Sequence, residues 1–116
     1  MKLFNSVGPN PKVVRMYMAE RGIEVDLEEV DLMKAENRGE AYLAKNASGT
    51  TPALELDDGS YLCEIVAICE YLDEISDASS LIGNTAAERA EARMWSRRVD
   101  LNILEPLTNG FRYSEG

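Results

Sequence analysis

Hydrophobic and polar residues follow two repeating patterns along the chain, one typical of short strands and one typical of amphipathic helices. Apolar residues gather in the short stretch 2–5, which predicts a strand. They recur at three- and four-residue steps in 11–21 and 64–75, which predicts two helices. The acidic stretch 26–30 alternates imperfectly, as an exposed edge strand does. A short helix is expected over 39–46.

Residues that favour helix ends bound the first of these helices. Pro11 suits the first helical position, and Gly22 is placed to end the helix. The loop before it contains two candidate polar groups, Ser6 and Asn10. Asn10 could cap the helix ahead of Pro11, and Ser6 could bond to its own backbone at the end of the strand. The expected apolar stripe of the helix consists of Val13, Val14, Tyr17 and Met18.

The clearest pattern lies in the middle of the chain. Pro52 precedes an apolar strand at 53–56, and the turn 57–59 leads to a return strand that begins at Tyr61. A helix then opens at Glu64. Proline donates no backbone hydrogen bond, so it belongs at a strand start, and a helix start suits a carboxylate. If the bond before Pro52 is cis, these features predict a site for an extended peptide. The alternative is an ordinary hairpin with a turn proline.

A separate helical segment is predicted near the end of the chain. Thr85 and Glu88 form a capping-box pattern, in which each side chain can satisfy a backbone N–H of the other residue. The helix that follows carries Trp95 on its apolar side, and Pro106 should kink or end it. Apolar residues such as Leu107 need a partner that the rest of the chain does not supply. This predicts a fragment or a reduced protein. The alternative is one domain onto which the helix packs.

Composition narrows the classes of function. The chain has 116 residues, 45 % of them apolar, which is enough for one domain. No apolar run approaches membrane-spanning length and no segment resembles a signal peptide, so a cytoplasmic protein with no membrane partner is expected. The formal net charge of -9 argues against nucleic acid as a partner.

Histidine is absent from the chain and cysteine is rare. The chain has no histidine, which is the commonest metal ligand and general base. Its two cysteines, Cys63 and Cys69, fit neither a disulfide framework nor a zinc site. We therefore expect buried thiols and no metal.

Three segments together resemble one known family. KLFNSVGPNPKVVRMYMAERGI, VDLMKAENRGEAYLAKNASGTTP and TTPALELDDGSYLCEIVAICEYL are similar to the glutathione-binding half of soluble glutathione transferases, over residues 2–76. The resemblance implies an α/β, thioredoxin-like fold (βαβ-α-ββα) with a mixed four-stranded sheet and helices on both faces. It implies a glutathione-binding domain at 1–76, a linker at 77–85, and the first helix or helices of a truncated all-helical domain at 86–116.

The resemblance also implies an activity, in which the thiolate of glutathione attacks a small hydrophobic electrophile. The group that acts on the thiol comes from the loop after the first strand, where this chain offers Ser6 and Asn10 as catalytic candidates. Many relatives carry a second Ser or Cys in this loop, and Gly8 falls at that position. No cysteine precedes Cys63, which argues against branches of the family that form a mixed disulfide with glutathione.

A second set of positions would hold the glutathione co-substrate. The residues that the resemblance places there are Asn37, Arg38, Thr50, Thr51, Pro52, Glu64 and Ile65. The backbone of Thr51, before a cis-proline, would pair with the cysteinyl part, and Glu64 would hold the γ-glutamyl group. Ile65 replaces the usual Ser and keeps its N–H, or it is simply a core residue. Arg38 would pair with the glycine carboxylate, or it is a surface residue.

Two functions of different class remain open from the sequence. The first is a glutathione transferase, favoured by Thr51-Pro52 and Glu64. The second is a non-catalytic transferase-like module for interaction or dimerisation, favoured by Gly8 and Ile65. The family resemblance also implies a homodimer, with two aromatic residues as interface candidates, Tyr71 and Trp95.

Overall fold

The chain folds as two units, Met1–Ala78 and Ser79–Gly116, which are described separately. The structure is a computed structural model that describes residues 1–77 and 79–114. Ala78, inside the expected linker, and residues 115–116, at the end of the expected helical part, lie outside the described residues.

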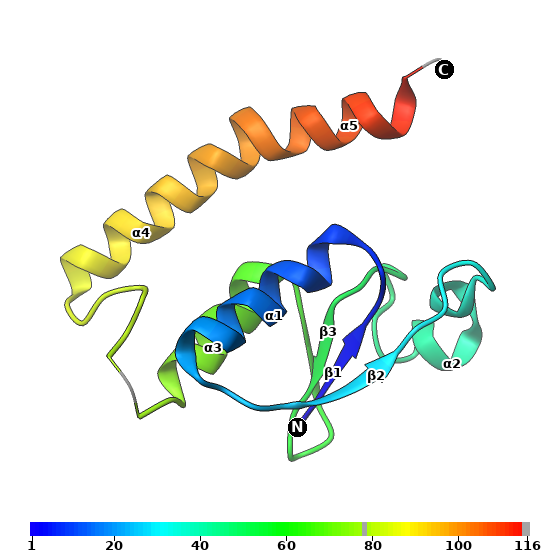
Figure 1. Ribbon diagram of the computed structural model, residues 1–116, viewed down its shortest axis with the longest axis horizontal. Helices are drawn as coiled ribbons and strands as arrows, with labels where there is room; N and C mark the ends of the chain where they lie inside the picture. Colours follow the sequence, from blue (N-terminus) through cyan, green and yellow to red (C-terminus); the bar gives the residue numbers. More distant parts are fainter. Residues whose placement is uncertain (78, 115–116) are drawn as a thin grey trace. The chain divides into compact units, whose positions relative to one another are not determined.

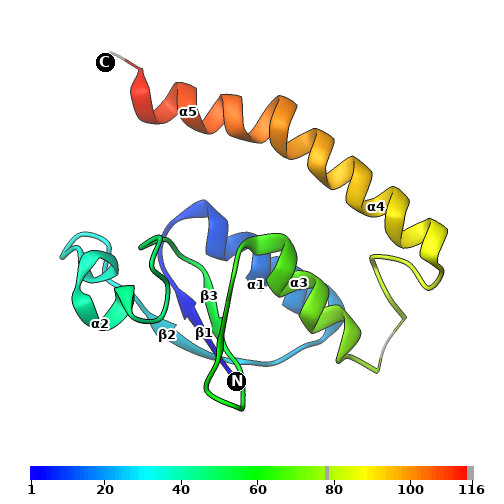
Figure 2. The same cartoon turned by 180° about the vertical axis from the view of Figure 1, so that it is seen from behind.

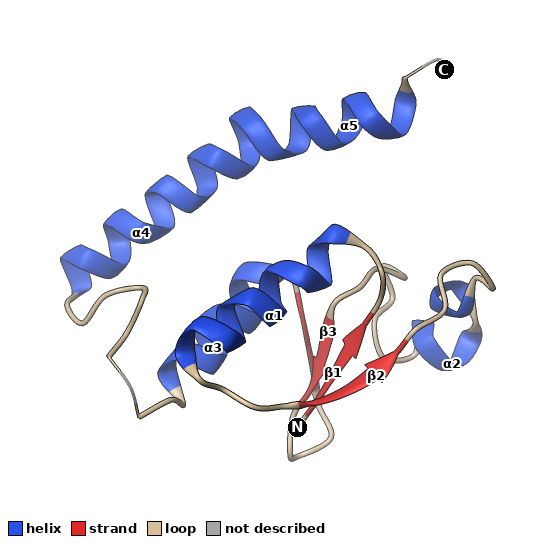
Figure 3. Cartoon of the chain, in the orientation of Figure 1, coloured by secondary structure: helices blue, strands red, loops and turns tan. Residues whose placement is uncertain are grey.

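A mixed four-stranded sheet forms the centre of the first unit (Figure 1, Figure 3). Its strands are β1 (Lys2–Asn5), β2 (Asp26–Glu29), β3 (Ala53–Glu55) and β4 (Tyr61–Cys63), in the order β2-β1-β3-β4. β1 pairs with β2 in parallel, whereas β3 is antiparallel to both β1 and β4. All four residues of β2 are exposed at one edge of the sheet, which confirms the predicted edge strand.

Helices cover both faces of this sheet. α1 (Pro9–Arg21) and α3 (Ile65–Glu74) lie side by side, and α2 (Glu40–Leu43) lies apart from them after a short 3-10 helix, η1 (Glu36–Arg38) (Figure 1, Figure 2). Successive side chains of β1 point to opposite faces of the sheet, so β1 contributes to both hydrophobic clusters of this unit. Leu3 packs with the buried residues of α1 and α3, and Phe4 packs on the opposite face with Tyr42 of α2. The expected thioredoxin-like arrangement is confirmed.

The start of α1 differs from the prediction. The helix begins at Pro9 rather than Pro11, with Gly8 as its N-cap and no side-chain capping bond, so the expected cap by Asn10 is wrong. Either proline satisfies the preference for proline in the first turn, and the sequence alone does not choose between them. Val13 was also misplaced in the apolar stripe, since it is 46 % exposed while Val14 is buried.

A buried polar cluster joins α1 to α3. Arg21 Nε lies 2.9 Å from Asp73 Oδ1, and the Tyr17 hydroxyl donates to the same oxygen. The side chains of Arg21 and Asp73 are almost fully enclosed. Burial and the bond to Asp73 raise the pKa of Tyr17 above its ordinary value. The packing of the two helices is therefore fixed by charge and hydrogen bonds as well as by apolar contact.

The second unit is a run of helix that begins at a capping box. α4 (Ala86–Val99) starts after Thr85, whose hydroxyl accepts the Glu88 N–H while the Glu88 carboxylate accepts the Thr85 N–H, as predicted. Gly83, at φ +116°, lies so close to Glu88 that a Cβ there would be 2.5 Å from the Glu88 Cβ. Glycine is therefore required at this turn.

Pro106 does not end the helical run. α4 passes into a π-helical segment, η2 (Asp100–Leu104), and then into α5 (Glu105–Tyr113), which has Pro106 in its first turn. A proline is tolerated there because the first turn of a helix needs no internal N–H bond. The interruption falls just before the proline, in η2. Large apolar side chains along this unit, among them Trp95, remain exposed.

Candidate functional site

The strand register brings three chain segments together at one end of the strands. Phe4 in β1 and Cys63 in β4 both stand opposite Ala53, the first residue of β3. Ser6, which follows β1, and Glu64, which follows β4, therefore flank Thr51-Pro52, which precedes β3. Because α1 follows β1 and α3 follows β4, both helices begin at this same end of the strands. The sequence predicted the motifs, and the antiparallel register places them together.

The main chain of Thr51 is available for pairing. Its bond to Pro52 is cis, as the resemblance implied. The sheet ladder begins only at Ala53, and within 1–77 and 79–114 no main-chain hydrogen bond involves the N–H or the carbonyl of Thr51. These two groups are thus free to bond to an extended ligand.

The side chains of Ser6 and Thr51 bind each other. Ser6 is 1 % exposed, and its Oγ lies 2.7 Å from Thr51 Oγ1. It also accepts a long bond from the Gly8 N–H, at 3.4 Å. The local backbone bond that the sequence allowed is therefore present, beside a second bond to Thr51. Ser6 ties the loop before α1 to the segment before β3.

The first turn of α1 presents few donors. Pro9 and Pro11 have no N–H, so Asn10 supplies the N–H between them and also carries a half-buried side-chain amide. Gly8 leaves room beside them, because a Cβ there would meet no atom closer than 3.5 Å. The positive end of the α1 dipole, with Asn10 in the first turn, thus lies at the same end of the strands as Thr51.

Side chains before β3 secure the Gly49–Thr50 backbone. Asn37 Nδ2 donates to the Gly49 carbonyl at 2.8 Å, and Arg38 lies beside Gly49 with its guanidinium exposed. The Thr50 carbonyl accepts from the Tyr42 hydroxyl at 2.7 Å and from Asn46 Nδ2 at 2.8 Å. The bonds to the Thr50 carbonyl were missed at the sequence level, since bonds to a main-chain carbonyl follow no residue spacing.

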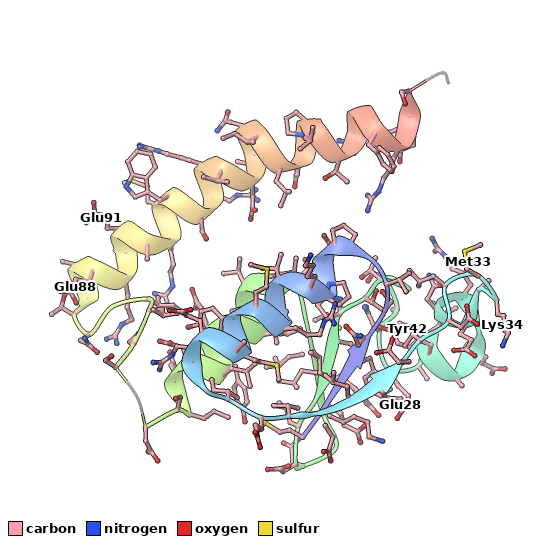
Figure 4. The ribbon with its side chains drawn as sticks, viewed as in Figure 1. Glu28, Met33, Lys34, Tyr42, Glu88 and Glu91 are labelled. Atoms are coloured by element: carbon pink, nitrogen blue, oxygen red, sulfur yellow. The ribbon has the colours of Figure 1, made fainter. Side chains whose placement is uncertain are left out.

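Tyr42, labelled in Figure 4, comes from α2 and lies against the sheet. Its ring meets that of Phe4 edge-on, with the centroids 5.9 Å apart. Burial raises the pKa of Tyr42 to about 12, so its hydroxyl remains protonated at neutral pH.

Glu64 has an unusual backbone conformation. It is the N-cap of α3 with φ 75° and ψ 129°, although it is not a glycine, and its side chain makes no capping bond. Such a conformation is strained, and strain in a non-glycine residue is often found at functional sites. Its side chain is exposed beside the first N–H groups of α3. The Ile65 side chain packs partly on the core, which agrees with the core alternative, while its N–H stays at the helix start.

The two thiols lie in different surroundings. Cys69 is buried as expected, and burial raises its pKa to about 11. Cys63 is only half-buried, and its pKa is raised by burial and by the neighbouring Glu64 carboxylate. Both thiols are therefore held in the protonated form, which is a poor nucleophile.

The described part of the chain has neither a cluster of metal-binding side chains nor a helix that could span a membrane. Within it, three or more His, Cys, Asp or Glu side chains nowhere gather in a group that could hold a metal ion. Its helices are too short or too polar to cross a membrane.

Known proteins are similar to this chain in sequence and in fold. A family model described as the N-terminal domain of glutathione S-transferase matches residues 7–75. Glutathione S-transferase 2 of Saccharomyces cerevisiae is 38 % identical over 109 residues, which are 92 % of this chain and 47 % of the yeast protein. A class Gtt2 glutathione S-transferase of Vibrio parahaemolyticus superposes with a TM-score of 0.88 at 37 % identity, over 98 % of this chain and 58 % of that chain.

A second similar structure was solved with ligands. It is a maleylacetoacetate isomerase from Methylobacterium extorquens AM1 with bound malonate and GSH, with a TM-score of 0.73 and 28 % identity over 85 % of this chain and 47 % of that chain. The chain spans about half the length of the curated relatives that it matches. The family match runs through Thr51, Pro52 and Glu64 and covers more than half of the chain. With its thioredoxin-like domain, the chain thus belongs to the glutathione S-transferase family.

Proposed function

We propose that this chain binds glutathione at the end of the strands near Thr51 and Glu64. It would be the glutathione-binding part of an enzyme that conjugates the thiolate of glutathione to a small hydrophobic electrophile. One observation carries the proposal. An unpaired length of backbone at Thr51 lies next to the start of α3, so main-chain pairing and carboxylate binding are available side by side.

The ligand would lie extended across this end of the strands. The Thr51 N–H and carbonyl would pair with the cysteinyl residue of glutathione, as a strand pairs with its neighbour. The γ-glutamyl carboxylate would accept from the Ile65 N–H at the start of α3, and the Glu64 carboxylate would hold the ligand's amino group. Arg38, exposed beside Gly49, would pair with the glycine carboxylate, with Asn37 and Thr50 shaping that end of the site.

The thiol would lie near the start of α1. The Asn10 donors and the helix dipole would stabilise the thiolate, and the lost proton would pass to solvent. The sulfur would then form a bond to a carbon of the electrophile and displace its leaving group, which departs to solvent as an anion. Ser6 remains a candidate for the same role. Its burial and its bond to Thr51 favour a supporting position over direct contact with sulfur.

The transferase is favoured over the non-catalytic module because the similar proteins are named as transferases and an isomerase, one of them with GSH bound. A cytoplasmic homodimer is also part of the proposal. The acidic sequence without a membrane-spanning pattern supports the location. The exposed side chain of Trp95 and the partly buried Tyr71 support an interface.

Calorimetry with glutathione tests the proposal directly. Glu64→Ala and Arg38→Ala are compared with Glu74→Ala, which removes the same charge from the opposite end of α3. We expect affinity to fall about ten-fold or more for Glu64→Ala, because a hydrogen bond to a charged group is lost. Glu74→Ala should bind normally. Absence of glutathione binding by the unaltered protein would exclude the function, and conjugation to a chromogenic aryl halide is the next assay if binding is found.

A further inference from the structure

Two buried side chains fix the peptide group between Thr50 and Thr51. The Tyr42 hydroxyl and Asn46 Nδ2 both donate to the Thr50 carbonyl, at 2.7 and 2.8 Å, and the two residues are 6 % and 5 % exposed. In a trans peptide the carbonyl and the N–H that follows it point in opposite directions. The Thr50-Thr51 bond is not among the cis bonds of the described residues. Bonds that hold the Thr50 carbonyl toward Tyr42 and Asn46 therefore hold the Thr51 N–H in the opposite direction, away from these two side chains.

We infer that Tyr42 and Asn46 are positioning residues, which orient and polarise the Thr51 N–H for the main chain of the ligand without touching the ligand. The inference rests on the proposed glutathione site, because the ligand group in question is the cysteinyl carbonyl. Hydrogen bonds in a chain strengthen one another, so two donors on the Thr50 carbonyl make the N–H of the same peptide a stronger donor.

Both donors are themselves held in place. The Tyr42 ring is fixed edge-on against Phe4, and its raised pKa keeps the hydroxyl protonated. The orientation of the Asn46 amide is set by Ser48, whose N–H and hydroxyl both donate to Asn46 Oδ1, at 3.2 and 2.7 Å. Since Oδ1 is the acceptor for Ser48, the amide nitrogen is the atom that faces Thr50.

The chain offers a matched pair of tyrosines for the test. Tyr42 and Tyr61 both lie near the Phe4 ring, with centroids 5.9 and 6.3 Å from it. Of these two tyrosines, only Tyr42 makes a hydroxyl hydrogen bond to another described residue. Tyr42→Phe and Tyr61→Phe each remove one oxygen, and Tyr42→Phe alone removes a bond to the Thr50 carbonyl.

Glutathione affinity and the NMR signal of Thr51 are then measured. For Tyr42→Phe we expect the Kd for glutathione to rise about three- to ten-fold, the effect of one hydrogen bond, with less than a two-fold change for Tyr61→Phe. KM for glutathione should rise while kcat is unchanged, because the lost interaction is uniform binding. In the ligand-free protein the 15N resonance of Thr51 should move in Tyr42→Phe, since that nitrogen is joined to the carbonyl that loses a donor.

The outcomes separate this inference from the proposed function. If the unaltered protein binds glutathione and Tyr42→Phe binds it equally well, the inference is overturned and the proposed site stands. If the unaltered protein does not bind glutathione, the proposed function fails and the inference fails with it. Should Tyr42→Phe not fold, Asn46→Ala removes the other donor to the Thr50 carbonyl, and its glutathione affinity decides in the same way.

Discussion

Replacing Glu64 with glycine is expected to stabilise the protein and to weaken glutathione binding at the same time. Glu64 holds φ at 75° in a region that favours glycine. A non-glycine residue in such a conformation costs about 1–3 kcal/mol, and a glycine costs about 0.5–1 kcal/mol in extra freedom of the unfolded chain. The net gain in the free energy of unfolding is therefore about 0–2.5 kcal/mol, with a middle value of about 1 kcal/mol.

This gain can be measured by thermal unfolding. At about 4–8 °C per kcal/mol for a domain of this size, a gain of about 1 kcal/mol should raise the melting temperature by roughly 4–8 °C. The matched control is Glu64→Ala, which also removes the carboxylate but keeps a Cβ in the strained conformation. It should leave the melting temperature almost unchanged, since it relieves no backbone strain.

Binding should fall in both variants. Each loses the carboxylate proposed to hold the amino group of glutathione, a charge-assisted bond worth roughly 1.5–3 kcal/mol, which is about ten- to hundred-fold in Kd. Calorimetry on the two variants separates backbone from side chain. A melting temperature for Glu64→Gly at or below that of Glu64→Ala would refute the strain argument, and unchanged affinity in both would refute the role of the carboxylate.

Three further predictions concern the parts that support the site. Gly49→Ala should lower the free energy of unfolding by about 2 kcal/mol or more in urea titration, because φ is +63° and the new Cβ would lie 3.0 Å from the Asn37 carbonyl; an unchanged midpoint would contradict this. Asp73→Asn should cost about 3–5 kcal/mol, since it breaks the buried ion pair between Asp73 and Arg21, and a loss below 1 kcal/mol would show that the pair is dispensable. Folding raises the pKa of Tyr42 from its ordinary value of 10.0 to about 12, so its contribution of about 2 kcal/mol is complete below pH 10 and is lost as the pH rises from 10 towards 12. Tyr42→Phe should flatten that part of a plot of stability against pH, and identical alkaline slopes in the two proteins would count against it.

Local sequence patterns predicted the residues that are proposed to contact the ligand, but not the residues that hold them in place. Thr51-Pro52 and Glu64 can be predicted because a proline before a strand and the start of a helix each have a recognisable residue pattern. Their proximity follows from the β3–β4 register, which the hairpin turn at 57–59 indicates. No such pattern identifies Tyr42 and Asn46, because both donate hydrogen bonds to a main-chain carbonyl, a group that every residue possesses.

The helix start at α1 shows a different limit. Pro9 and Pro11 satisfy the same preference for the first turn, and the choice between them depends on the path of the loop after β1. The choice matters for the proposed chemistry. With the start at Pro9, Asn10 lies inside the first turn as a donor instead of preceding the helix as its cap.

The edge strand β2 has a consequence for solubility. An unpaired strand edge can join the edge of another molecule and start aggregation, and charged side chains are a common defence. β2 carries Asp26, Glu28 and Glu29, all exposed, and the net charge of the chain has the same sign. Near the isoelectric point of about 4.5, repulsion between molecules is weakest. The same acidic residues that mark β2 as an edge therefore keep copies of the protein apart at neutral pH, and mild acid removes that protection.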